Sequence, residues 1–330
     1  MIQRILLVVW IGLFISCKEE VKLQPNYLKG KALGTTFSLQ YFDQEQKDYR
    51  ASFDSLIQVI NISLSTYQDD SDISRINAGD TTVVIDEHFQ KVFNASKKIH
   101  KETSGAFDPT IGVLVNAWDF GPKGEIQGLD SLKIDSLLGT VGLDKVHYKQ
   151  GKIHKEHTDT FLDFNALAKG YTVDVFAMFL EQEGYTDYLV EIGGEIRTKG
   201  YNVAKNKPWK IGVEEPNFDG TQSYNKVISL KTEAMATSGS YRKYKVDKEG
   251  NRYAHIIDTK TGYPHKSNLL SVSILANTCM EADAYATALT SMGVQQSIEF
   301  LTQHPELRAL LIYEKGGALK TEAFNGFPEN

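Results

Sequence analysis

Cysteine is scarce in this chain, which rules out a fold built on a disulfide framework. Only Cys17 and Cys279 occur in 330 residues. Cys17 ends an N-terminal apolar run, and if it is modified there, Cys279 has no partner for an intramolecular disulfide. A chain of this length can instead bury a core large enough, in one unit or in two lobes, to be stable without cross-links.

Other signals are also missing. The formal net charge is −6 and no block of basic residues occurs, so we expect no nucleic-acid partner. No Walker-type loop and no G-x-G-x-x-G stretch is found, which argues against a standard NTPase and against a Rossmann dinucleotide site. No low-complexity tract and no repeat with a period of about 20–50 residues interrupts the chain.

The N-terminus has the layout of a secretory signal, with a charge, an apolar run and a small residue in that order. Arg4 is its single charge, and the apolar run Ile5–Ile15 is shorter than the about 20 residues of a membrane span. Cys17 follows a small residue, as in the lipobox of bacterial lipoproteins, although Phe14 stands where Leu is usual.

This layout predicts a lipoprotein signal peptide over residues 1–16, lipidation of Cys17, a tether over residues 17–28 and a folded domain over residues 29–330. The protein would then be exported and lipid-anchored, at the periplasmic side of an inner membrane. An ordinary signal peptide or an uncleaved anchor is the alternative interpretation.

Helix and strand patterns mix along the remaining chain without a regular βαβ rhythm. Helical spacing of apolar residues predicts helices over residues 53–65, 73–77, 87–103, 131–138, 166–184, 281–292 and 294–303. Runs rich in β-branched and aromatic residues predict strands over residues 35–42, 147–153, 160–163, 188–192, 209–213, 227–230, 233–238, 253–258, 270–276 and 309–314. We therefore predict an α+β (mixed α/β) fold, in one compact unit with two lobes.

The stretch MEADAYATAL, Met280 to Leu289, is the most informative one. It places Asp283 and Thr287 four residues apart in an alanine-rich run, so that both side chains lie on one face of a helix. A carboxylate and a hydroxyl are hard oxygen donors of the kind that Mg²⁺ takes. Two surface polar residues at this spacing are the common alternative.

Three further segments carry chemistry in their sequence. SGAFDPTIG, from Ser104 to Gly112, combines Phe107, on which a flat ligand could stack, with Asp108, which could meet the ligand's polar edge; a capped turn is the alternative. LDFNALAKGY places Lys169 in the first turns of a helix, where phosphate binds well, unless Asn165 is simply a cap and the lysine is solvated. YAHIIDTKTGYP places His255 in a predicted strand.

Taken in order, these segments resemble the ApbE family, the FAD:protein FMN transferases. The matching stretches are LGTTFSL, LSTYQDDSDISRIN, TSGAFDPTIGVLVNAWDFGP, LDFNALAKGYTVD, YLVEIGGEIRTKG, ATSGSYRKY, HIIDTKTGYP and TCMEADAYATALTSMG. Leu33 stands where the family often has Met, and Asn165 stands where Ser is common. A lipoprotein signal agrees with this resemblance, because members are often exported and lipid-anchored.

The resemblance implies an FAD site in a cleft between two lobes, with Mg²⁺ on the pyrophosphate. It implies that the side chains of Asp283 and Thr287 and the carbonyl of Ala166 bind the metal. The implied FAD-binding residues are Leu33, Tyr67, Ala106, Phe107, Asp108, Asp163, Lys169 and His255. Lys169 would face the phosphates, and the catalytic roles fall to Asp283 and to His255 as candidate proton acceptor.

The reaction that the resemblance implies is attack by a threonine hydroxyl of an acceptor protein on the FMN phosphorus of FAD, with release of AMP. The implied acceptors are subunits of exported or membrane redox complexes. If water attacks instead, the same site is an FAD pyrophosphatase that gives FMN and AMP. A non-catalytic exported FAD-binding protein is the other alternative, although a carrier has no need of a metal-binding pair.

Overall fold

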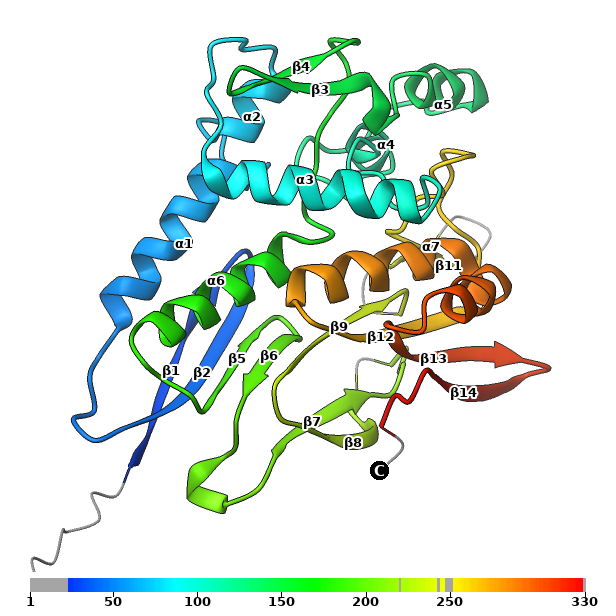
Figure 1. Cartoon of the computed structure of the whole chain (residues 1–330). Coiled ribbons are helices and arrows are strands. Elements are labelled where there is room, and N and C mark those ends of the chain that lie inside the picture. The colour runs from blue at the N-terminus through cyan, green and yellow to red at the C-terminus, as the bar shows by residue number, and fades with distance from the viewer. Residues whose placement is uncertain (1–22, 220, 242–243, 247–251, 329–330) are drawn as a thin grey trace, which may run out of the picture.

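A computed structural model describes residues 23–219, 221–241, 244–246 and 252–328, and an eight-stranded antiparallel sheet runs through it (Figure 1). The strands follow the order β1-β2-β5-β6-β9-β12-β13-β14. Their bounds are β1 Gln24–Ala32, β2 Thr35–Asp43, β5 Tyr188–Ile192, β6 Glu195–Lys199, β9 Glu233–Gly239, β12 Leu269–Ala276, β13 Arg308–Lys315 and β14 Ala318–Phe324. The predicted α+β fold is confirmed.

Helices cover one face of the sheet and a hairpin covers part of the other (Figure 1). Helices α6 (Ala168–Gln182) and α7 (Cys279–Gln303) lie across the sheet, and the hairpin of β7 (Trp209–Glu214) and β8 (Tyr224–Leu230) packs on the opposite face. Beyond α6 and α7 lies a second lobe. Helix α1 (Arg50–Leu64) lies beside this lobe. The elements of the lobe are α2 Asp72–Asn77, α3 Glu87–Glu102, α4 Gly112–Ala117, α5 Ser131–Leu138, β3 Val146–Lys149 and β4 Lys152–Lys155.

The sequence of each helix explains where it lies. Helix α6 buries ten of its 15 residues because the sheet lies beneath it and helices lie above it. Helix α3 begins where Asp86 accepts a hydrogen bond from the amide of Phe89, and it buries a stripe that includes Phe89 and Val92. Helix α7 begins at a Thr278 cap and is interrupted at Gly293, whose φ is 74°, so the two predicted helices are two arms of one element.

Several predicted boundaries were wrong. Residues 160–163 form no strand, and Phe161 alone makes an isolated bridge there. Strand β3 instead forms a hairpin with β4. The predicted strand over residues 253–258 reduces to β11 (Arg252–Ala254). Among the described residues β11 pairs with β10 (Tyr244–Val246) alone, so His255 lies in a bend after a strand. The sequence also gave no sign of α4, of β14 or of the short 3₁₀ turns over residues 143–145 and 203–205.

The sheet begins inside the segment that the sequence predicted as a tether. Strand β1 starts at Gln24 and pairs with β2 over its whole length, so residues 24–28 belong to the sheet. The predicted signal peptide and Cys17 lie outside the described residues. Among the residues that are described, no helix is both long enough and apolar enough to cross a membrane.

Candidate functional site

One large cavity brings together every catalytic, FAD-binding and metal-binding residue that the sequence suggested. Its volume is about 870 Å³, inside the ~300–1,000 Å³ range of small-molecule sites. It lies where the loops of the second lobe meet α6, α7 and the ends of the sheet strands. The predicted residues that line it are Leu33, Tyr67, Ala106, Phe107, Asp108, Asp163, Ala166, Lys169, His255, Asp283 and Thr287.

Asp283 is buried at the contact between α6 and α7. Its Oδ2 accepts a hydrogen bond of 3.0 Å from the amide of Gly170. A side chain at position 170 would not fit, because a Cβ there would lie 2.3 Å from the carbonyl oxygen of Cys279 and 2.9 Å from the Cβ of Asp283. The glycine therefore allows the two helices to approach closely, and this close approach sets the position of the carboxylate.

A buried ion pair fixes the start of α7. Asp174 on α6 accepts hydrogen bonds from the amides of Cys279 and Met280 at 3.0 and 2.9 Å, and it pairs with Arg197 on β6 at 2.8 Å. The carboxylate thus satisfies amides that a helix start leaves without partners. Sequence reasoning did not single out Asp174.

The oxygen atoms expected to bind a metal are available for one. Gly170 is the third residue of α6, so its amide has no acceptor within the helix, and it donates to Asp283. The carbonyl of Ala166, which lies just before the helix, accepts no hydrogen bond in the described part of the chain. The hydroxyl of Thr287 also makes no hydrogen bond there, whereas Thr290 bonds the carbonyl four residues back at 2.7 Å. A carboxylate, a hydroxyl and a carbonyl that converge on one cavity fit Mg²⁺.

Lys169 is held by a carboxylate that the sequence analysis missed. Its Nζ lies 2.5 Å from Oε1 of Glu195, a residue that is only 2 % exposed. Burial raises the pKa of Glu195 to about 7, against the opposing effect of Lys169. Burial by itself would lower the pKa of Lys169, but the neighbouring carboxylates of Asp283 and Glu195 raise it.

The lysine is therefore a cation in the wall of the cavity, and not the solvated side chain of the alternative interpretation. Asn165 is exposed and is not the cap of α6, whose N-cap residue is Leu167. A signal for Glu195 was present in the sequence, since it is a carboxylate directly after Gly193-Gly194 at the start of a strand.

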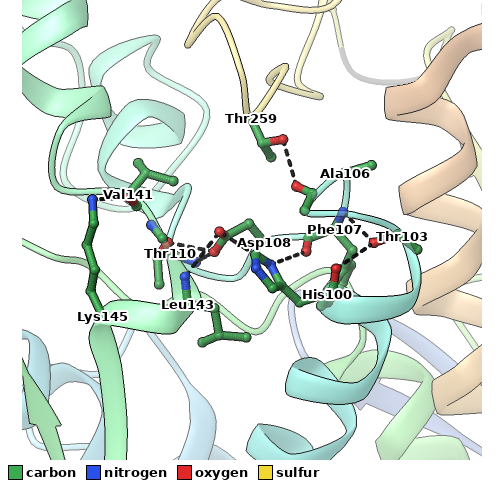
Figure 2. A network of polar contacts seen from close by, with 12 residues as sticks. His100, Thr103, Ala106, Phe107, Asp108, Thr110, Val141, Leu143, Lys145 and Thr259 are labelled. Atoms are coloured by element: carbon green, nitrogen blue, oxygen red, sulfur yellow. Dashed lines mark hydrogen bonds and ion pairs between the residues drawn. The ribbon is translucent and has the colours of Figure 1, made fainter.

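The segment from Gly105 to Asp108 is here called the wall segment (Figure 2). The side chains of Phe107 and Asp108 do not face a ligand as the sequence predicted. The Asp108 carboxylate points into the protein, where Oδ1 accepts from the amide and hydroxyl of Thr110 at 2.8 and 2.6 Å and Oδ2 accepts from the amide of Leu143 at 3.3 Å. Phe107 is 2 % exposed, and its ring packs in the core. The two residues line the cavity, but they shape its wall from behind it.

The remaining predicted residues lie around the cavity. Leu33 occupies the two-residue turn between β1 and β2 with a φ of 50°, a left-handed conformation that is uncommon for a residue other than glycine. Tyr67 is 63 % exposed. His255 is half-buried, and its ring centroid lies 6.3 Å from that of Phe120. The site thus joins an aromatic and apolar part to a charged end at Lys169 and Asp283.

Comparison with known proteins agrees with this arrangement. The ApbE family profile matches residues 33–311. The FAD:protein FMN transferase of Haemophilus influenzae is 34 % identical over 325 residues, with 94 % of this chain and 92 % of the relative covered, and that of Vibrio cholerae is 32 % identical with 97 % of each covered.

Solved structures give the same result for the fold. The flavin transferase ApbE from Vibrio cholerae superimposes with a TM-score of 0.84 at 32 % identity, covering 93 % of this chain and 99 % of that one. The ApbE protein from Thermotoga maritima gives 0.79 at 28 % identity, covering 90 % and 96 %. With its motifs in family order and its site residues gathered in one cavity, this chain belongs to the ApbE family.

Proposed function

We propose that this protein transfers the FMN moiety of FAD to a threonine of an acceptor protein and releases AMP. The observation that carries the proposal is the cavity, which is large enough for a small-molecule ligand and joins an apolar part to a lysine and three oxygen donors. FAD likewise combines flat rings, which suit the apolar part of the cavity, with a charged pyrophosphate, which suits the part that holds the lysine and the oxygen donors. Membership in a family whose relatives are FAD:protein FMN transferases supports it.

We propose Mg²⁺ as the metal, held by Asp283, Thr287 and the carbonyl of Ala166. Bound there, it would supply positive charge to the pyrophosphate and to the leaving AMP. Asp283, Glu195 and Lys169 together carry a net charge of −1 when all three are ionised, which favours a divalent cation. With that cation the charge becomes +1, which favours an anionic pyrophosphate.

The residues of the chain orient the reacting groups. Lys169 binds phosphate oxygens, and the wall segment with Tyr67 and Leu33 confines the rings. His255, on the segment after β11, accepts the proton of the attacking threonine hydroxyl. The hydroxyl oxygen forms its bond to the FMN phosphorus as the bond from that phosphorus to the AMP oxygen breaks, so the acceptor becomes an FMN phosphodiester.

The test is a reconstitution with FAD, Mg²⁺ and an acceptor peptide that carries the target motif Asp-x-x-Ser/Thr-Gly-Ala-Thr. We expect a fluorescent acceptor with the mass of FMN added and one AMP released per label. Release of FMN and AMP with an unlabelled acceptor would point to the pyrophosphatase. Stoichiometric FAD binding without AMP would point to a carrier.

We also propose that the protein is exported and anchored by lipid at Cys17. The N-terminal sequence supports this, and six residues separate Cys17 from the start of β1 at Gln24. An extended linker of that length spans about 20 Å, which would hold the domain close to a membrane surface. Metabolic labelling with palmitate tests the anchor, and a Cys17→Ala variant that takes up as much label as the native chain would refute it.

A further inference from the structure

The wall segment is held by side chains from three other parts of the chain, two of which lie far away in the sequence. Three consecutive carbonyls, those of residues 105–107, each accept a hydrogen bond from a different element. The donors are Thr259 Oγ1 to Gly105 at 2.7 Å, Ser291 Oγ to Ala106 at 2.9 Å and His100 Nδ1 to Phe107 at 2.9 Å. Figure 2 shows the bonds from Thr259 and His100. Since a carbonyl only accepts, the proton of His100 is on Nδ1.

The amides of the same residues are also satisfied internally. The Gly105 amide donates to the carbonyl of His100 at 2.8 Å, and the Ala106 amide donates to the carbonyl of Thr103 at 3.1 Å. The Phe107 amide donates to the hydroxyl of Thr103 at 3.1 Å. With the Asp108 carboxylate engaged as well, the segment has partners for its backbone polar groups from residue 105 to residue 107.

The amides of residues 105–107 are thus all engaged within the protein, so these three residues offer a ligand no free amide donor. The segment lines the cavity with Ala106 and Phe107, and the ring of Phe107 is buried. Hydrogen-bonding groups that are already paired do not discriminate between ring substituents, whereas a fixed surface discriminates by shape.

Two of the three donors lie on the elements that carry the proposed chemistry. Ser291 follows Asp283 and Thr287 at four-residue intervals on α7, so the three line one face of the helix and all reach the cavity. Thr259 follows His255 by four residues in the segment after β11. The hydroxyls therefore tie the wall both to the metal-binding helix and to the segment of the candidate base.

We propose that Ser291 and Thr259 are positioning residues, which hold the wall segment as a rigid surface against one planar ring of the nucleotide. This inference rests on the proposed function, because it takes the ligand to be FAD. Both halves of FAD carry a flat heteroaromatic ring, and the wall segment could contact either of the two rings. Measurements on the two halves, FMN and ADP, identify which ring the wall contacts.

The experiment measures the dissociation constants of FMN and of ADP, by calorimetry in the presence of Mg²⁺, for Ser291→Ala and Thr259→Val in the full-length chain. Each variant loses one neutral hydrogen bond behind the wall. We expect about five-fold weaker binding of one half, the same half for both variants, with the other half within about two-fold of the native value. Thr259→Ser and Ser291→Thr keep the hydroxyl and should restore binding.

Thr261→Val is the matched control, because Thr261 is exposed in the same segment and its hydroxyl contacts only the amide of Tyr263, at 3.4 Å. Unchanged affinity for both halves in both variants would overturn the proposal. So would an equal loss for both halves, or a loss that the hydroxyl-bearing replacements do not restore, since these indicate general loosening. A native protein that binds both halves and never releases AMP from FAD would overturn the proposed function alone.

Discussion

The close contact between α6 and α7 gives a sharp test of how the proposed metal site is positioned. In Gly170→Ala, the new Cβ would lie 2.3 Å from the carbonyl oxygen of Cys279 and 2.7 Å from its carbonyl carbon. Both atoms belong to the backbone, so no side-chain rotation relieves the clash. An ordinary contact is longer by about 1 Å, and α7 must retreat by that distance, carrying Asp283 with it.

The consequences for stability and for activity differ in size. Overpacking of this kind costs about 1–3 kcal/mol, which lowers the melting temperature by about 1.5–5 °C for a chain of this length. A displacement of about 1 Å at a reacting centre costs about 100-fold in rate. We therefore expect a folded protein with about 100-fold lower kcat/KM for AMP release from FAD and with weaker Mg²⁺ binding.

The assay compares AMP release, calorimetric Mg²⁺ affinity and thermal melting of the native chain and of Gly170→Ala. Gly139→Ala is the control, because Gly139 has a helical φ of −58° at the end of α5 and its added Cβ would come no closer than 3.2 Å to another atom. If Gly170→Ala kept native turnover and Mg²⁺ affinity, the spacing of α6 and α7 would not position Asp283, and the reasoning would be refuted.

The other predictions concern single groups. Asp283→Ala should lower AMP release by at least about 100-fold while circular dichroism and melting show an intact fold, and undiminished turnover would remove Asp283 from the metal site. Asp174→Asn should cost about 1.5–3 kcal/mol in denaturant unfolding, since it removes the charge that pairs with Arg197 and with two amides at the start of α7, while Arg197 keeps Glu181 at 3.3 Å. A change below about 1 kcal/mol would contradict this. Hydrogen bonds from Thr82 and Arg75 lower the pKa of Asp80 to about 2. Because the lowered pKa stabilises the fold above the ordinary value near 3.8, the stability difference between native chain and Asp80→Asn should be present at pH 6 and vanish as the pH falls towards 2. A difference that is equal at both pH values would disprove that assignment.

Local patterns predicted most of the secondary structure and failed where partners lie far away in the sequence. The helix over residues 87–103 and the strand over residues 188–192 were predicted closely, because both carry a strong periodicity between clear boundaries. The strand predicted over residues 253–258 was wrong. Its apolar residues Ile256 and Ile257 are buried in a bent segment, and Ile257 packs against the second lobe. The sequence pattern alone does not distinguish such a bent segment from a strand.

The site shows the same limit. Motifs and family resemblance named the residues that line the cavity, but not how their polar atoms are used. Asp108 was expected to face the ligand, yet its carboxylate is engaged by Thr110 and by Leu143, which lies 35 residues further along the chain. Glu195 was overlooked, because its role depends on Lys169, 26 residues earlier.

The sequence by itself determined that Asp283, Thr287 and Ser291 share one face of a helix, because that spacing follows from helical geometry alone. It placed the start of that helix at residue 281, two residues after its start at Cys279 behind the Thr278 cap. Only the tertiary structure decided that the amide of Gly170, in the first turn of α6, donates to Asp283, 113 residues away. Such pairings depend on how two packed helices meet, and the free energy that selects them comes from the whole core, so no local pattern contains them.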